Sequence, residues 1–154
     1  QEIVMLCPNC YYFLKDKLEI QVLSIYEKLS QLGIGRKVEG EGRLFLPCPD
    51  REEQQWVSWL NPFFQQEPEI IKGTQCCGLG GCAGGKEPDL ARDMACHVAE
   101  EGYKKVYTYC ASCAGNLTRN GCKGVSHLLT EILDFHEQPD VARSMINRMM
   151  TKFW

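Results

Sequence analysis

The residues of this chain best suited to chemistry are cysteines that occur in tight groups. Two groups are the C-x-x-C pairs of residues 7–10 and 110–113, and a third is the adjacent pair Cys76-Cys77, which opens the glycine-rich stretch CCGLGGCAGG. The whole chain has 10 cysteines in 154 residues. Grouping of this kind is typical of metal or redox sites, whereas the cysteines of a disulfide scaffold are spread across the loops of a small secreted domain.

Thiolates are soft ligands, so a sulfur-rich site indicates zinc or an iron–sulfur cluster. A structural zinc needs four ligands, and the two C-x-x-C pairs could supply them as Cys7, Cys10, Cys110 and Cys113. That site would leave Cys48 and the adjacent pair without a role. Adjacent cysteines suit a multinuclear cluster, because neighbouring thiolates reach different irons and glycines let backbone N–H groups approach inorganic sulfide. A metal-free thiol–disulfide protein that uses a C-x-x-C pair is a third alternative.

The segments around the cysteines alternate between short strands and helices. Apolar strands are expected over residues 2–6, 43–46, 69–71 and 105–109, and a cysteine follows each of them. Helices are expected over about 14–32, after a capping Asp50, and over about 88–101, 112–119, 125–136 and 139–154. Strands that alternate with helices predict an α/β fold, in which a small parallel β-sheet carries helices on both faces.

The loops that follow the strands of a parallel sheet all emerge at one edge of the sheet, where ligands bind in open α/β folds. The sequence therefore predicts that five cysteines converge at this edge: Cys48, Cys76, Cys77, Cys110 and Cys113. Cys7 and Cys10 should lie at the same edge, and Cys82 inside the glycine-rich loop is a further candidate ligand. Cys96 and Cys122 are expected to be structural thiols.

Composition excludes several functional classes. Hydrophobic residues make up 44% of the chain, charged residues 24%, and the net charge is −3. This balance is typical of a globular domain with its own core, and it shows no basic excess that would suit nucleic acid. The sequence contains no signal-peptide pattern and no apolar run long enough for a transmembrane segment. We therefore expect a cytoplasmic protein.

Three segments, LFLPCPD, CCGLGG and YTYCASCAGNL, together resemble the cysteine-rich CCG domain. This domain occurs in heterodisulfide reductase subunits B and D and in iron–sulfur subunits of glycerol-3-phosphate, glycolate and lactate oxidising complexes. CPNCYYFLK resembles the C-x-x-C segment that closes a first CCG repeat, and SHLLTEIL resembles the segment that follows the second. The resemblance implies that residues 1–40 are the last unit of a first CCG-like repeat and that residues 41–136 are a CCG domain. The pattern of residues 137–154 predicts a C-terminal amphipathic helix.

The resemblance also implies a cofactor and a role. The related motif is similar to one that binds a noncubane 4Fe-4S cluster, and by match the ligands here would be Cys48, Cys76, Cys77, Cys110 and Cys113. In the relatives, the cluster takes electrons from a flavin- or iron–sulfur-containing subunit and passes them to a disulfide or another acceptor. The chain is thus expected to be part of an oxidoreductase, with zinc in a structural module as the alternative. The first repeat contributes only its C-x-x-C, so this chain alone cannot assemble a second cluster.

Overall fold

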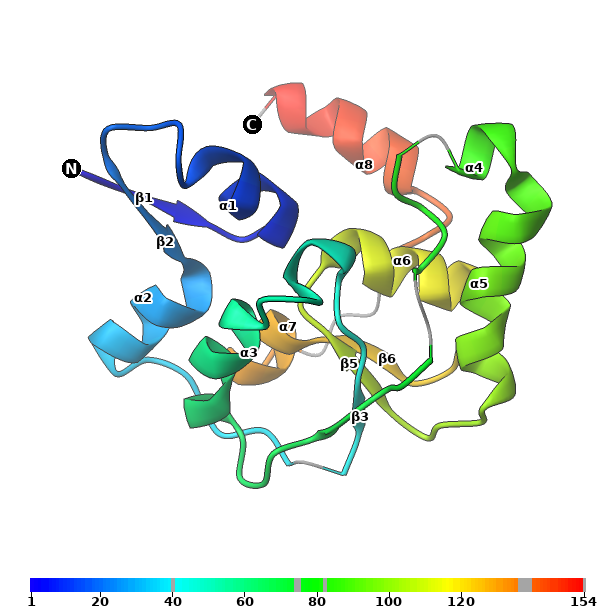
Figure 1. Ribbon diagram of the computed structural model, residues 1–154, viewed down its shortest axis with the longest axis horizontal. Coiled ribbons are helices and arrows are strands. Elements are labelled where there is room, and N and C mark those ends of the chain that lie inside the picture. The colour runs from blue at the N-terminus through cyan, green and yellow to red at the C-terminus, as the bar shows by residue number, and fades with distance from the viewer. Residues whose placement is uncertain (40, 74–75, 82, 136–139, 154) are drawn as a thin grey trace.

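The computed structural model describes residues 1–39, 41–73, 76–81, 83–135 and 140–153 of the chain (Figure 1). Its strands are β1 (Glu2–Met5), β2 (Gln21–Ser24), β3 (Arg43–Leu44), β4 (Glu69–Ile70), β5 (Val106–Thr108) and β6 (Val125–His127). Its α-helices are α1 (Pro8–Leu14), α2 (Ile25–Leu32), α3 (Gln55–Leu60), α4 (Ala83–Lys86), α5 (Pro88–Glu100), α6 (Ala111–Arg119), α7 (Leu128–Ile132) and α8 (Ser144–Met150). Three short 3-10 helices complete the described elements: η1 (Cys48–Asp50), η2 (Asn61–Phe63) and η3 (Thr151–Phe153).

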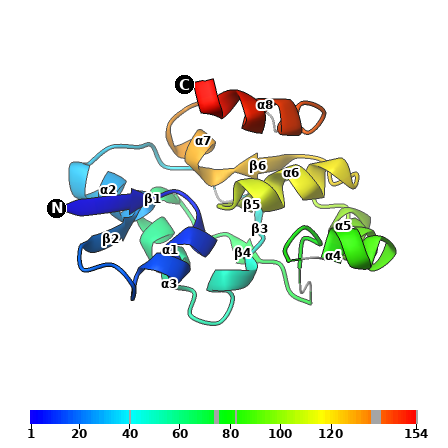
Figure 2. The ribbon, with the colours of Figure 1, turned by 90° about the horizontal axis from the view of Figure 1, so that it is seen from above.

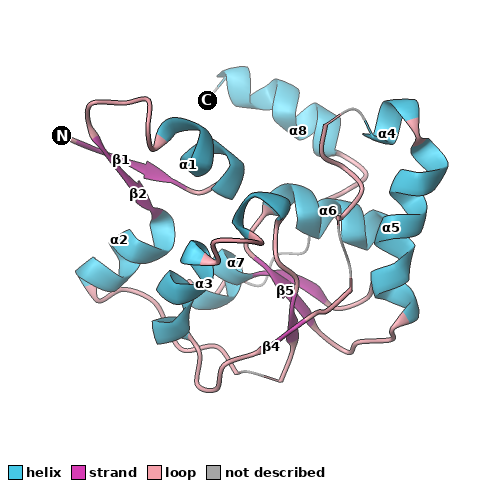
Figure 3. Cartoon of the chain, viewed as in Figure 1, coloured by secondary structure: helices cyan, strands magenta, loops and turns pink. Residues whose placement is uncertain are grey.

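The strands form two parallel sheets. A four-stranded sheet has the order β4-β3-β5-β6, and a two-stranded sheet contains β1 and β2, which Figure 3 shows as a separate group. In the larger sheet, Arg43 of β3 pairs with Glu69 of β4 on one side and with Val106 of β5 on the other. The chain thus passes from β3 to β4 on one side of β3 and then crosses to β5 on the other side. Such a switch point forms a crevice at the carboxyl ends of the strands, where ligands bind in open α/β sheets.

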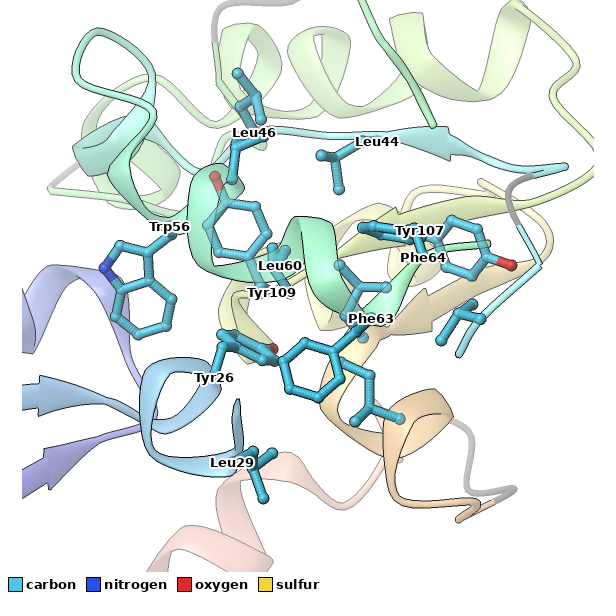
Figure 4. Close-up of a cluster of buried hydrophobic side chains, with 14 of the residues drawn as sticks. Tyr26, Leu29, Leu44, Leu46, Trp56, Leu60, Phe63, Phe64, Tyr107 and Tyr109 are labelled. Atoms are coloured by element: carbon cyan, nitrogen blue, oxygen red, sulfur yellow. The ribbon is translucent and has the colours of Figure 1, made fainter. Parts of the chain in front are cut away.

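Helices cover both faces of the four-stranded sheet, because side chains alternate along its strands. Leu44 and Tyr107 belong to a core cluster that also contains residues of α2, α3 and α7 (Figure 4). Their chain neighbours Phe45 and Val106 belong to a second cluster with residues of α5 and α6. These two clusters confirm the predicted α/β fold, with parallel strands between helices.

The helix predicted over residues 14–32 is wrong in its middle, where the chain forms β2. Leu18 and Ile20 are 38% and 37% exposed, so the spacing of apolar residues did not mark a buried helical face. Residues 21–24 instead pair with β1 along its whole length. The Ser24 side chain then accepts the backbone N–H of Glu27 and begins α2.

The C-terminal part of the chain also departs from prediction. Residues 125–127, expected to begin a helix, pair with β5 as the edge strand β6, and α7 starts only at Leu128. The expected helix over 139–154 is described as α8 and η3, and residues 139 and 154 lie outside the described part. Figures 1 and 2 show α8 at the outer edge of the molecule, on the side of α6. Three of its apolar side chains, Met145, Ile146 and Met149, are exposed. In the described part of the chain, we find no helix that combines the length and apolar character needed to cross a membrane.

One hydrophobic core joins the first 39 residues to the four-stranded sheet. Tyr26 of α2 and Trp56 of α3 are both completely buried, and their ring centroids lie 5.7 Å apart. Tyr11 of α1 meets the same tryptophan edge-on, with 5.8 Å between centroids. The β1–β2 unit therefore packs onto the core of the rest of the chain, and the division proposed at residue 40 stays a prediction.

Candidate functional site

The cysteine loops follow the strands in the predicted order. Cys7 occupies the N-cap of α1 after β1, Cys48 begins η1 after β3, and Cys110 occupies the N-cap of α6 after β5. Cys76 and Cys77 follow β4. Every cysteine in the described part of the chain is a free thiol. These positions leave the sulfurs available as ligands or as redox groups.

Cys48 and Cys76 form a first pair of sulfurs, although 28 positions separate them in the sequence. Their Sγ atoms are 3.6 Å apart, whereas a disulfide bond measures about 2.0 Å, so they are in contact and not bonded. The backbone N–H of Gly78 points at the Cys76 sulfur, with 3.3 Å between the two atoms. Burial and the contact with Cys76 raise the pKa of Cys48, while the positive charge of Arg51 opposes that rise.

Cys77, Cys110 and Cys113 form a second group, linked by hydrogen bonds between thiols. Hydrogen bonding with Cys113 lowers the pKa of Cys77 to about 7 and that of Cys110 to about 6. The same bonds, together with burial, raise the pKa of Cys113 itself. Of the three thiols, Cys113 therefore holds its proton most firmly. The thiolate is the form that ligates metals and acts as a nucleophile.

The two groups of thiols adjoin each other and a third pair. The charge on Cys77 contributes to the raised pKa of Cys48, and the charge on Cys110 contributes to that of Cys10, whose thiol is hydrogen-bonded to Cys7. The five predicted ligands thus share one neighbourhood, and the C-x-x-C pair of residues 7–10 lies beside it. Within the residues described, no three Cys, His, Asp or Glu side chains are arranged as a metal-ion site.

The loop that carries Cys77 is held between two helices. Gly78 has a φ of +81°, and a Cβ atom at this position would lie 1.9 Å from the carbonyl oxygen of Ala91 in α5, so the close approach requires glycine. On the other side, Asn116 of α6 donates from Nδ2 to the carbonyl oxygen of Cys77 at 2.6 Å. The sequence analysis missed Asn116. A polar residue one helical turn after Cys113 could have indicated a hydrogen bond to the cysteine loop.

A buried carboxyl group, which sequence reasoning took only for a helix cap, connects the cysteine loops. Asp50 has no exposed surface, and its Oδ1 accepts the backbone N–H of Trp56 in the first turn of α3 at 3.1 Å. The same Oδ1 accepts the hydroxyl of Tyr12 at 2.5 Å, and Oδ2 accepts the hydroxyl of Tyr109 at 2.6 Å. Burial raises the pKa of both tyrosines, so both phenols keep their protons and act as donors. We call Tyr12, Asp50 and Tyr109 the Asp50 clamp.

The Asp50 clamp joins three segments that follow three different strands, namely α1 after β1, η1 after β3 and the connection from β5 to α6. Each of its residues stands one or two positions from a cysteine, namely Cys10, Cys48 and Cys110. A movement of any one of these segments would break a hydrogen bond to Asp50, whose side chain is fully buried. The clamp therefore fixes the positions of these three thiols relative to one another.

Of the remaining cysteines, Cys122 belongs to the same hydrophobic cluster as Cys77 and Cys113, and Cys96 lies on α5. Cys96 is half-buried on α5, and its sulfur lies 3.6 Å from the carbonyl oxygen of Asn120. Cys122 is buried, which raises its pKa. The predicted candidate Cys82 falls outside the described residues. A cavity of about 500 Å³ runs along α5, and none of the five predicted ligands lines it.

Comparison with known families identifies the segment that holds most of these thiols. Residues 65–118 match the family model described as a cysteine-rich CCG domain. Of the five predicted ligands, Cys76, Cys77, Cys110 and Cys113 fall within the match and Cys48 precedes it. No curated protein matches the chain. The family match indicates a metal- or redox-related function, and it is consistent with a metal or an iron–sulfur cofactor.

Proposed function

We propose that this chain, which carries a cysteine-rich CCG domain over residues 65–118, is the cluster-binding redox part of a heterodisulfide reductase-like oxidoreductase. Its proposed ligands are Cys48, Cys76, Cys77, Cys110 and Cys113. The observation that supports the proposal is the meeting of their thiols, since the sulfurs of Cys48 and Cys76 are in contact and a hydrogen bond with Cys113 lowers the pKa of Cys77. The thiols come from the loops after three neighbouring strands, β3, β4 and β5.

The chemistry of the donor set fits an iron–sulfur cluster. Five thiols exceed the four ligands of a structural zinc, and two of them have pKa values near or below neutrality without any metal. Arg51 contributes a positive charge near Cys48, and its Nη2 atom is buried without a hydrogen-bond partner in the described structure. An anionic thiolate–sulfide group would balance that charge. When bound, such a cluster supplies one-electron transfer at a potential set by burial and hydrogen bonds.

The protein's own residues would then determine access and stability at the site. Cys77 and Cys113 are buried and shield the inner side, whereas Cys48 is exposed and leaves an open side. We propose that a flavin- or iron–sulfur-containing subunit delivers electrons here, and that a disulfide or another acceptor takes them. A cluster of the noncubane 4Fe-4S type is the proposed form, and the cytoplasm is the proposed location.

One observation favours a second candidate, a zinc-stabilised structural module. The charge of Cys110 acts on Cys10, so the two C-x-x-C pairs lie near each other. Cys7, Cys10, Cys110 and Cys113 could then hold one zinc ion, because paired C-x-x-C segments are common zinc ligands. This arrangement gives no role to the contact between Cys48 and Cys76.

Metal and sulfide analysis of protein purified without oxygen tests the proposal. We expect about four irons and four sulfides per chain, with broad visible absorption. Both should be lost in Cys76→Ser and kept in Cys96→Ser, which changes a thiol outside the group. One zinc without sulfide, kept in Cys76→Ser but lost in Cys10→Ser, would contradict the cluster and support the zinc module.

A further inference from the structure

We propose that Cys48 and Cys76 form a reversible oxidation site, at which a hydroperoxide joins the two thiols in a disulfide and so withdraws two of the five proposed ligands from metal binding. The effect on metal binding rests on the proposed function. The disulfide itself needs only the chain's own thiols and the oxidant, so the two proposals can fail separately.

The first observation is the contact between the two sulfurs. Their Sγ atoms are 3.6 Å apart, although 28 positions separate the two cysteines in the sequence. A disulfide bond measures about 2.0 Å, so these atoms, now 3.6 Å apart, need to approach each other by only about 1.6 Å. Rotation of a cysteine side chain between its staggered rotamers moves the sulfur without moving the backbone. The pair can therefore close while the surrounding loops keep their places.

The second observation is that the segments on both sides of this contact are anchored. Cys48 begins η1, and Asp50 at the end of the same 3-10 helix is held by the Asp50 clamp. On the other side, the backbone N–H of Gly78 donates to the Cys76 sulfur at 3.3 Å. Gly78 is itself packed against the carbonyl group of Ala91 in α5. The fold therefore holds the two sulfurs facing each other.

Access from solvent distinguishes this pair from the more deeply placed thiols of the site. Cys48 is exposed and Cys76 is half-buried, whereas Cys77 and Cys113 are buried in the second core cluster. Reversible oxidation favours an accessible thiol that has a second thiol beside it. Burial and the contact with Cys76 raise the pKa of Cys48, so the reaction requires sustained exposure to the oxidant. Cys48 is thus the thiol that the oxidant meets, and Cys76 is its partner.

The reaction balances in two steps. A hydroperoxide R–O–O–H oxidises the Cys48 sulfur to a sulfenic acid, and its O–O bond breaks to release R–O–H. The Cys76 sulfur then attacks the sulfenic sulfur, the S–S bond forms, and the S–O bond breaks to release water. The two sulfurs lose two electrons and the peroxide gains them. The two thiol protons end in the alcohol and the water.

The disulfide changes what the site can bind. Metals bind cysteine as the thiolate, and a disulfide offers no thiolate. The oxidised site would therefore keep only Cys77, Cys110 and Cys113 of the five proposed ligands. A reducing thiol breaks the S–S bond by exchange and restores both lost ligands. The pair would act as a redox-sensitive switch that determines whether the site accepts its metal.

Peptide mapping of the oxidised chain tests the disulfide. The full chain is purified and reduced without oxygen, freed of metal with a chelator, treated with hydrogen peroxide, alkylated and digested with trypsin. Cleavage after lysine and arginine places Cys48 in the peptide of residues 44–51 and Cys76 in that of residues 73–86, which also contains Cys77 and Cys82. We expect these two peptides to be joined before any other pair, and to separate after treatment with dithiothreitol.

Serine variants identify the partner of Cys48 within the longer peptide. The link should persist in Cys77→Ser and Cys82→Ser and be lost in Cys76→Ser, where dimedone should trap a sulfenic acid on Cys48. Cys96→Ser, which changes a thiol on α5, should behave as the wild type. A link that survives in Cys76→Ser, or peroxide that joins other cysteines while Cys48 stays reduced, would overturn the proposal.

Cobalt(II), followed by the absorption of its thiolate complexes, measures the effect on metal binding. We expect the disulfide to weaken cobalt binding by at least about tenfold, because two ligands are lost. Reduction, followed by removal of the reductant, should restore the binding. Equal cobalt binding by the oxidised and the reduced chain would show that the pair does not control the site, and would overturn the switch.

Iron and sulfide analysis of the reduced chain separates these results from the fate of the proposed function. A disulfide between Cys48 and Cys76 in a chain that takes up no iron would support the oxidation site and reject the cluster. Iron and sulfide in a chain that forms no such disulfide would keep the cluster and reject the oxidation site.

Discussion

Asp50 is a carboxylic acid with no exposed surface, and it is tolerated because three donors satisfy it. Two of these donors are phenols whose pKa values burial raises, so both hydroxyls keep the protons that they donate. A buried polar group costs free energy unless it is hydrogen-bonded, and removing one partner leaves the others unsatisfied. Stability and site geometry therefore depend on the same residue.

Replacement of Asp50 should destabilise the protein more than its small volume suggests. Asp50→Ala leaves two hydroxyls and the Trp56 N–H without an acceptor, and we expect a loss of about 3 kcal/mol in the free energy of unfolding. Urea denaturation measures this loss. Asp93→Ala, an exposed carboxylate on α5, is the matched control and should change stability by less than about 0.5 kcal/mol. Equal effects in both variants would contradict the clamp.

His127 should make stability depend on pH. Burial lowers its pKa to about 4, compared with about 6.5 in an unfolded chain. Between these values the unfolded state binds a proton that the folded state does not, so stability is full above pH 6.5 and falls as pH decreases towards 4. The maximal slope from this residue is about 1.4 kcal/mol per pH unit.

The variant His127→Asn isolates this contribution. The His127 side chain accepts the N–H of Leu129 at the start of α7, and asparagine can keep that cap. Denaturation series between pH 7 and pH 4.5 should show a weaker pH dependence in the variant. His97→Asn, an exposed position on α5, should retain the wild-type slope. A slope unchanged in His127→Asn would show that this histidine does not titrate as stated.

Among the elements, the sequence predicted four strands and the cysteines after them, because short apolar runs that end in a cysteine are local signals. It missed β2 and β6, since Gln21–Ser24 and Val125–His127 are short and become strands only by pairing with β1 and β5. Pairing partners lie outside any local window, and tertiary context overrides propensity. The meeting of the cysteine loops was predictable from the parallel sheet, whereas the contacts of Asn116 and Asp50 were not.

The loop after β4 depends on a glycine that approaches α5. Gly78→Ala would place a methyl group 1.9 Å from the Ala91 carbonyl oxygen in a left-handed backbone conformation. We expect the loop to shift, the metal content to fall several-fold and the unfolding midpoint to decrease. Gly80→Ala is the matched control, because nothing lies within 4 Å of a Cβ atom at that position. Equal metal contents in the two variants would show that this close approach does not hold the cysteine loop.

For the molecule as a whole, the first 39 residues and the four-stranded sheet share one core. Trp56 is enclosed by Tyr11 and Tyr26 from the N-terminal unit and stacks on Tyr109, 5.9 Å away between centroids. The division at residue 40 separates two sequence repeats, whereas residues on both sides of it contribute to the same core cluster. The cysteine site lies where these units meet.

A chain that begins at residue 41 should fold poorly on its own. It would expose the Trp56 face of α3 and lose Tyr12 from the clamp, and large core deletions of this kind cost several kcal/mol. Circular dichroism and thermal unfolding of this fragment, beside the full chain, measure the effect. A fragment that unfolds cooperatively at the temperature of the full chain would show that residues 41–136 form an independent domain.

The Asp50 clamp has a consequence for how this protein can diverge. Its three members come from segments far apart in the sequence, and each phenol has an acceptor only while the acid is present. Loss of the acid would relax selection on both phenols. When related sequences are aligned, lineages that have lost the acid at position 50 should therefore have lost the phenols at positions 12 and 109 as well.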